Sequence, residues 1–265
     1  MSETTARFDK VLMPDAEALA HRGTFQRDGF VVVPGLFDER EIARISAWTD
    51  ELERLPEVPG RSMKYFETSL LRPGERLLQR IENFYPFHSG FSDLCDGDTL
   101  RGFVSLLFDE PAVLFKDKIN FKLAGGDGFK PHQDQQAGWS VYAALFITAM
   151  VSIDSTTAEN GCLELAAGHH THGLIGEEWK PLTDEDMRRL GARPVPTRAG
   201  DAVFFDSYTP HASGSNLTGE RRRVLYITYN RESAGDHRVR YFADKRRSFP
   251  PDIERDPNRT YTFRV

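Results

Sequence analysis

The hydrophobic pattern of the chain changes near Pro111. Before that point, residues 30–35 (FVVVPG) form a β-branched run closed by Pro-Gly, which predicts a strand and then a turn. Apolar residues recur at the helical period over residues 38–55, with acidic residues in the first turn, and predict an amphipathic helix. A second helical region is expected over residues 96–107. The first half of the chain is therefore expected to contribute mainly helices.

Beyond Pro111 the pattern becomes that of a β-protein. Polar and apolar residues alternate over residues 114–123 (LFKDKINFKL), which places Lys116, Lys118, Asn120 and Lys122 on one face of a strand. A long, nearly all-apolar strand is expected over 141–154, and shorter strands over 162–167, 201–207 and 221–230. Residues 173–200 are interpreted as a polar insertion between two strands. Short strands joined by such turns are typical of a sandwich or barrel that hides its edges, with helices on one outer face.

Composition restricts the classes of protein that this chain can represent. Its 265 residues fit one large domain or two small ones, and there is no linker long enough to separate two. The net charge of −6 argues against a nucleic-acid partner, which would call for a strongly basic face. Two cysteines are too few for a disulfide framework and favour a reducing cytoplasm. No apolar run suits a signal peptide or a membrane span, so we expect a cytoplasmic protein without a membrane partner.

Candidate metal ligands lie in the loop KPHQDQQAGW and far downstream. His132 and Asp134 are two residues apart in that loop, and His211 follows the strand expected at 201–207. Two histidines and one carboxylate on one face of a metal leave coordination positions open, an arrangement typical of non-haem Fe(II) oxygenases. The alternative for His132 and Asp134 is a loop histidine beside a solvated carboxylate.

Arg222 strengthens the metal hypothesis. It begins the strand expected at 221–230, and the apolar residues Val224 and Tyr226 share its parity and therefore its face. An arginine directed into a barrel needs a partner, because burying an unpaired charge is very unfavourable. Its planar fork suits the remote carboxylate of a dicarboxylic co-substrate whose other end chelates the metal. The alternative is that residues 221–223 form a solvated basic patch.

Taken together, four ordered motifs resemble the phytanoyl-CoA dioxygenase superfamily of Fe(II)- and 2-oxoglutarate-dependent oxygenases. They are RDGFVVVPGLFDEREI, HQD, ENGCLELAAGHH and HASGSNLTGERR, within residues 23–231. The resemblance implies a mainly β fold with flanking helices, a double-stranded β-helix of the jelly-roll or cupin-like type. We expect a single domain over residues 1–265, with a helical part to about 110, a barrel core over about 111–232 and an extension over 233–265. Ala-Ala-Gly replaces the more common Pro-Gly in ENGCLELAAGHH, which affects a turn rather than a ligand.

The resemblance also assigns roles to individual residues. It implies that the metal ligands are His132, Asp134 and His211, and that Arg222 and Ser213 hold the far carboxylate of 2-oxoglutarate. Asn120 matches a strand asparagine that contacts the co-substrate; the weaker candidates on its face are Lys118 and Lys116. The implied reaction consumes O2, converts 2-oxoglutarate to succinate and CO2, and hydroxylates a carbon. Because Asp134 is retained, hydroxylation is favoured over halogenation. Histidines in the third motif are interpreted as structural: His169, His170 and His172.

Four further stretches look most like the bacterial phosphonate hydroxylases, which oxidise 2-aminoethylphosphonate and its N-methylated relatives beside phosphorus. They are residues 63–67, 80–88, 134–139 and 241–256. A small zwitterion needs basic groups for its phosphonate and acidic or aromatic groups for its ammonium. The substrate candidates are Gln135, Gln136, Trp139, Lys64, Tyr65 and Arg80. For most of them an ordinary surface or core position is the alternative.

Two other functions stay open. The first is hydroxylation of another small molecule by the same chemistry: an amino acid, an ectoine-like solute or an acyl-CoA. The polar Gln135 and Gln136 argue mildly against a long acyl chain. The second is a jelly-roll binding module without turnover, which the intact set of ligands and co-substrate arginine opposes.

Overall fold

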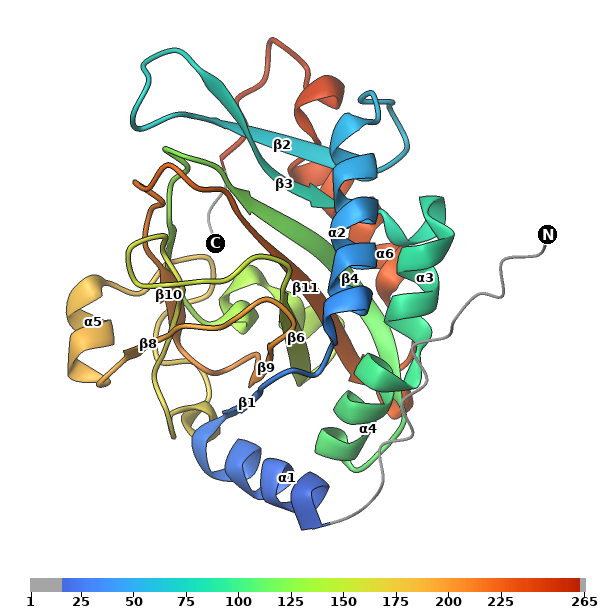
Figure 1. Ribbon diagram of the computed structural model, residues 1–265, viewed down its shortest axis with the longest axis vertical. Coiled ribbons are helices and arrows are strands. Elements are labelled where there is room, and N and C mark those ends of the chain that lie inside the picture. Colours follow the sequence, from blue (N-terminus) through green and yellow to red (C-terminus); the bar gives the residue numbers. More distant parts are fainter. Residues whose placement is uncertain (1–15, 263–265) are drawn as a thin grey trace.

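Two antiparallel sheets form the centre of the protein, as a computed structural model shows for residues 16–262 (Figure 1). The larger sheet has the strand order β1-β9-β6-β11-β4-β3-β2, and the smaller sheet has the order β5-β10-β7-β8. The strands are β1 (Phe30–Val33), β2 (Met63–Thr68), β3 (Arg76–Glu82), β4 (Ala112–Lys122), β5 (Phe129–His132), β6 (Phe146–Ser152), β7 (Leu163–Leu165), β8 (Arg193–Val195), β9 (Ala202–Asp206), β10 (His211–Ser213) and β11 (Arg222–Arg231).

Helices cover the outer face of the larger sheet. The α-helices of residues 16–262 are α1 (Ala16–Asp28), α2 (Glu39–Arg54), α3 (Ser89–Asp96), α4 (Phe103–Phe108), α5 (Asp184–Arg189) and α6 (Arg238–Ser248), with a π-helical turn at Asp98–Gly102; of these, α5 lies instead beside β8 of the smaller sheet. Figure 1 shows α2, α3 and α4 on the side of the larger sheet away from β8 and β10. Leu225 and Ile227 of β11 belong to the core that these helices share. Val224 and Tyr226 belong to a second core with Leu163 of the smaller sheet. The alternation of β11 thus separates a helix-facing core from the space between the sheets.

The sequence determines the start of α2 locally. The Asp38 carboxylate accepts a hydrogen bond from the backbone N–H of Glu41 at 2.8 Å, and the Glu41 carboxylate accepts one from the N–H of Asp38 at 2.8 Å. This reciprocal capping box satisfies backbone donors that the first helical turn leaves free. The helix then buries Ile45 and Leu52 against the sheet. The predicted helix over 38–55 is confirmed.

Most other expected elements are also confirmed. β7 and β9 fall within the segments expected to be strands, β4 and β11 match theirs to within two residues at each end, and residues 96–107 are helical apart from a short break. Two facing sheets with helices outside confirm the expected mainly β jelly-roll class. Within residues 16–262, no helix combines the length and the apolar character needed to cross a bilayer.

Three expectations about elements were wrong in part. The strand expected over 141–154 begins only at Phe146, because the carbonyl groups of Ala143 and Ala144 accept hydrogen bonds from the Gln135 side chain instead of pairing in a sheet. The first half is mainly helical as expected, but it also contributes β2 and β3, which were not predicted and which join the larger sheet. The segment over 173–200 lies between the strands β7 and β9, as expected of an insertion, but it also contains β8, which pairs with β7.

Candidate active site

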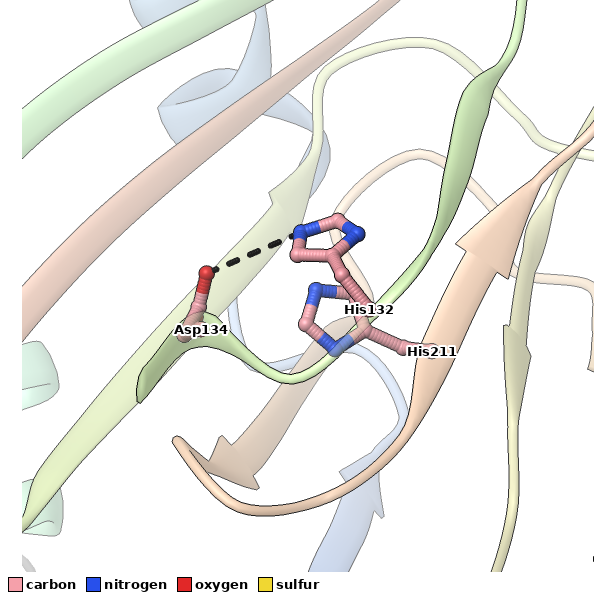
Figure 2. Close-up of side chains that lie close together, drawn as sticks. All are labelled: His132, Asp134 and His211. Atoms are coloured by element: carbon pink, nitrogen blue, oxygen red, sulfur yellow. Dashed lines mark ion pairs between the residues drawn. The ribbon is translucent and has the colours of Figure 1, made fainter. Parts of the chain in front are cut away.

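Three side chains meet between the two sheets. His132 ends β5, Asp134 lies two residues further on, and His211 begins β10 directly opposite His132 in the β5–β10 pairing. One ligand atom from each residue lies within 4.8 Å of the others. The closest charged contact is from His132 Nε2 to Asp134 Oδ1, at 3.9 Å (Figure 2). The structure therefore brings together the three residues that the sequence pattern proposed as metal ligands.

Hydrogen bonds to the backbone orient both imidazoles. His132 Nδ1 lies 2.6 Å from the carbonyl oxygen of Lys130, and His211 Nδ1 lies 2.9 Å from that of Thr209. A proton on each Nδ1 satisfies the carbonyl and leaves each Nε2 as the lone-pair donor. The Thr148 hydroxyl donates to Asp134 Oδ2 at 3.3 Å. Two imidazoles and one carboxylate held in this way suit a divalent iron ion.

The protonation states agree with metal binding. Burial, with the neighbouring His211, lowers the pKa of His132 to about 3. Burial also lowers the pKa of His211. Burial alone would raise the pKa of Asp134, but the two imidazoles and the nearby lysine ammonium groups outweigh it and hold that pKa below its usual value. At neutral pH the site thus offers neutral imidazoles and an ionised carboxylate, the forms that bind a metal.

A cavity opens beside these three residues. Its walls include five further sequence candidates, which are Lys116, Lys118, Asn120, Trp139 and Ser213. Burial lowers the pKa of Lys118 to about 7, and the charge of Lys116 acts in the same direction. The remaining lining residues are aromatic, aliphatic or hydroxyl-bearing: Phe129, Thr148, Leu163, Phe205, Ala212, Tyr226 and Thr228.

The candidates for co-substrate binding gather near Ser213. Arg222 is 1% exposed, and its Nε and Nη2 atoms have no hydrogen-bond partner within the part of the chain that the structure describes. Arg222 does not itself line the cavity, but it interacts with Tyr226, which does. The Oδ1 atom of Asn120 is likewise buried without a partner among residues 16–262. Buried donors without partners are unfavourable, so the two Arg222 nitrogen atoms make this end of the cavity fit a carboxylate of a small dicarboxylic acid, whereas Asn120 Oδ1 can only accept a hydrogen bond.

Most of the proposed substrate residues have other roles. Lys64 donates to the carbonyl oxygens of Glu53 and Leu55, and the Tyr65 hydroxyl donates to Phe249 O at 2.8 Å. Arg80 pairs with Glu82 at 2.9 Å. None of the three lines the cavity. These assignments are corrected because the side chains of Lys64, Tyr65 and Arg80 are buried within the protein and bonded to other groups of it.

The two glutamines after Asp134 are also structural. Gln135 donates to Ala143 O and Ala144 O, and Gln136 donates to the carbonyl oxygens of Glu177 and Lys180. Neither lines the cavity, so their assignment to substrate is corrected too. Trp139 alone of the substrate candidates lies in the wall. The histidines interpreted as structural lie in or beside the turn His170–His172, and none belongs to the three-residue cluster: His169, His170 and His172.

Sequence reasoning missed several residues that shape the site. Thr148 supports Asp134, and its hydroxyl lies 2.9 Å from that of Thr228. Lys122 donates a hydrogen bond to Ser213 Oγ at 2.8 Å. Its backbone lies opposite that of Arg222 in the register of β4 and β11. The alternation of β4 had placed Lys122 on the correct face, but Thr148 lies in an apolar run that gives no such indication.

Comparison with known proteins agrees with this geometry. The model of the phytanoyl-CoA dioxygenase (PhyH) family matches residues 25–224 of the chain. The chain belongs to the phytanoyl-CoA dioxygenase family. This PhyH protein is 44% identical over 236 residues to a 2-aminoethylphosphonate dioxygenase from the uncultured bacterium HF130_AEPn_1, with 89% of this chain and 90% of the relative covered. It is 36% identical over 228 residues to a methylphosphonate hydroxylase of Gimesia maris, with 85% of each chain covered.

Solved structures show the same fold. The epimerase SnoN, in a complex with Fe3+, alpha ketoglutarate and nogalamycin RO, superimposes with a TM-score of 0.70 at 22% identity and covers 93% of the PhyH chain and 95% of its own. EctD from S. alaskensis, with 2-oxoglutarate and 5-hydroxyectoine, gives a TM-score of 0.69 at 20% identity over 81% of the PhyH chain and 76% of its own. Family membership and the metal-ligand geometry confirm the expected enzyme class, an Fe(II)- and 2-oxoglutarate-dependent dioxygenase.

Proposed function

We propose that this protein hydroxylates 2-aminoethylphosphonate, or an N-methylated relative, at the carbon next to phosphorus. The observation that carries the substrate is the 44% identity, over nearly the full length of both chains, to a relative named for that compound. A second relative is named for methylphosphonate, which supports the phosphonate group as the shared feature. The cavity is compatible with an anion, because Lys116 and Lys118 line it beside the metal-ligand candidates.

In this proposal the residues of the chain position two reactants. His132, Asp134 and His211 hold Fe(II), while Arg222 and Ser213 hold the far carboxylate of 2-oxoglutarate. The bound iron, co-substrate and O2 supply the oxidation, which yields succinate, CO2 and a hydroxylated substrate. Asn120 and Lys118 lie between the two groups of residues and contact the co-substrate. The Trp139 ring walls the cavity and excludes water from it.

We further propose that residues 1–265 act as one domain in a reducing cytoplasm, on a small molecule and without a nucleic-acid or membrane partner. Cys95 and Cys162 are both buried and unpaired, which agrees with such a compartment. The net charge of −6 gives no support to nucleic-acid binding.

A substrate panel tests the function. Purified protein is supplied with Fe(II), ascorbate, 2-oxoglutarate and air, and succinate release is measured with 2-aminoethylphosphonate, its N-methylated forms, methylphosphonate, ectoine and L-proline. We expect the aminophosphonates to give the highest rate and a hydroxylated product with a new phosphorus NMR signal. Turnover of ectoine or L-proline without turnover of any phosphonate would show that the substrate is wrong while the enzyme class stands.

The variant Asp134→Ala tests the metal assignment in the same assay. Removal of the one carboxylate ligand should abolish both iron retention and succinate formation, measured by metal analysis and by rate. The matched control is Asp184→Ala, which removes an exposed carboxylate from α5 and should change neither. Full activity in Asp134→Ala would show that the ligand set is different.

A further inference from the structure

The strand β4 carries a row of polar side chains along the cavity. Lys116, Lys118 and Asn120 line the cavity, and Lys122 continues the row beside Ser213. Alternate residues on a strand are about 6.6 Å apart, so Lys116 and Lys122 are separated by about 20 Å. A single 2-oxoglutarate molecule is much shorter than this distance. If it is held near Arg222, which pairs with Lys122 in the sheet, it cannot also reach Lys116.

Lys116 lies at the opposite end, on the side of Asp134 and Trp139. Its strand neighbour Thr228 faces Thr148, the residue that donates to Asp134. The Lys116 ammonium nitrogen lies 5.1 Å from the ring centre of Trp139 and 5.7 Å from that of Tyr241. Within residues 16–262 it makes no hydrogen bond and no salt bridge. Its donors are therefore available to a ligand in the cavity.

Basic side chains outnumber acidic ones around Lys116. Four basic side chains influence one another here, and two carboxylates face them: Arg80, Lys116, Lys118 and Lys245, with Glu82 and Asp134. Burial lowers the pKa of both Lys118 and Lys245, so a bound anion would help to keep them protonated. Glu82 is already bound by Arg80 and Lys245, and Asp134 belongs to the metal-ligand set. An uncompensated buried cation is unfavourable, and an anionic ligand would restore the balance. An iron ion at the three ligands would increase the excess.

The same cavity has few groups that could bind the ammonium group of a substrate. Among the lining residues, Asp134 is the one carboxylate, and the rings of Trp139 and Tyr241 already face the Lys116 cation. A ligand that enters this end is thus selected by its anionic group more strongly than by its amine.

We propose that Lys116 binds the phosphonate oxygens of the substrate and so sets the specificity of the site for phosphonates. This inference rests on the proposed function and adds which residue recognises which part of the substrate. The phosphonate accepts charge-assisted hydrogen bonds from the Lys116 ammonium group. That contact holds the neighbouring carbon on the side of the cavity occupied by Asp134.

Steady-state kinetics of four proteins test the assignment: wild type, Lys116→Met, Lys116→Arg and Lys180→Met. We expect Lys116→Met to raise the KM for 2-aminoethylphosphonate about 10- to 100-fold, the cost of losing charge-assisted hydrogen bonds. The KM for methylphosphonate should rise by a similar factor, because the amine is not what Lys116 recognises. The KM for 2-oxoglutarate should stay within about twofold, which also shows that the variant is folded. Lys116→Arg should recover part of the loss.

The control Lys180→Met removes a side chain that is 68% exposed and should leave kcat and every KM unchanged.

The outcomes separate the inference from the proposed function. If the wild type turns over 2-aminoethylphosphonate and Lys116→Met has the same KM for it, the role of Lys116 is wrong and the proposed function stands. If wild type turns over no phosphonate, the proposed function fails. Calorimetric titration of 2-aminoethylphosphonate and methylphosphonate into the Mn(II)- and 2-oxoglutarate-loaded proteins then decides the inference. Binding to wild type that Lys116→Met loses supports it; equal binding or none overturns it.

Discussion

The two ends of the cavity hold their lysine side chains in different ways. At one end, Lys122 donates to Ser213 Oγ and to the backbone carbonyl oxygens of Gly161 and Gly214, so protein atoms fix its position. At the other end, Lys116 makes no hydrogen bond to the described residues and rests against aromatic rings. An amino group that donates to several oxygen atoms is restricted to one position. An amino group that contacts only ring faces, as that of Lys116 does, is less restricted.

This difference suits the binding of two ligands. The co-substrate is the same in every turnover, so side chains that are already fixed in its binding position are an advantage, because they lose less conformational freedom when it binds. A lysine that contacts only ring faces leaves more freedom for the shape of a ligand beyond its anionic group.

The largest effect that separates the two ends is expected from Arg222→Ala. Arg222 is buried, and two of its nitrogen atoms lack partners within residues 16–262. Loss of a buried charged partner costs about 2 kcal/mol or more, so the KM for 2-oxoglutarate should rise about 30-fold or more. The KM for the phosphonate, measured at saturating co-substrate, should change far less. Arg221→Ala is the control, since that side chain is 47% exposed and lies 3.4 Å from Asp50. Equal effects of the two variants would refute the assignment of Arg222.

A smaller effect is expected from the pH dependence of Lys122. Burial, reinforced by the charge of Arg222, lowers the pKa of Lys122 to about 6. A bound carboxylate favours the charged form, so above pH 6 the protein must take up a proton when 2-oxoglutarate binds. The affinity for 2-oxoglutarate should therefore fall as the pH rises from about 6 to about 8.

The variant Lys122→Met should remove this pH dependence of the affinity and weaken 2-oxoglutarate binding about tenfold below pH 6, where most of the wild-type lysine is charged. Calorimetric titration of 2-oxoglutarate into both proteins at three pH values measures the affinity and its dependence on pH. If the affinity of the variant for 2-oxoglutarate fell with pH as steeply as that of the wild type, another group would be the one that takes up the proton.

The smallest kinetic effect is expected from Lys64→Met. Lys64 carries the same charge as Lys116 but donates to the backbone carbonyl groups of Glu53 and Leu55. Its loss should lower the free energy of unfolding by about 1–3 kcal/mol and leave the KM for the phosphonate unchanged. Thermal unfolding gives the change in stability, and steady-state kinetics on the same preparation give the KM for the phosphonate. A raised KM with unchanged stability would place Lys64 in the substrate site after all.

Much of the barrel could be predicted because its elements have local patterns. The capping box at Asp38 and the alternation along β4 and β11 are visible within single segments. The β2–β3 hairpin was missed as part of the barrel, since its addition to β4 depends on contacts between distant segments. The start of β6 was missed because the Gln135 side chain takes carbonyl groups that an apolar run alone assigns to a strand.

The metal-ligand candidates were predictable for a different reason. Their residue types and order carry the chemistry, and the structure places all three in one cluster. The substrate candidates were predicted from composition near the mouth, and composition does not show which cations pair internally. Arg80 and Lys64 pair with groups of the protein, whereas Lys116 has no hydrogen bond or salt bridge to the part of the chain that the structure describes. Only the three-dimensional arrangement could distinguish these basic residues.

The helix α6 has a consequence for how the enzyme is completed during synthesis. Tyr241 on this helix contributes a ring to the Lys116 end, and Lys245 pairs with Glu82 of β3. A nascent chain that had reached only Arg231 would already contain His132, Asp134, His211 and Arg222. Lys116 and Trp139 would also be present, but the second ring beside Lys116, that of Tyr241, would be missing, so the ribosome delivers one wall of the Lys116 end after all the metal-ligand candidates.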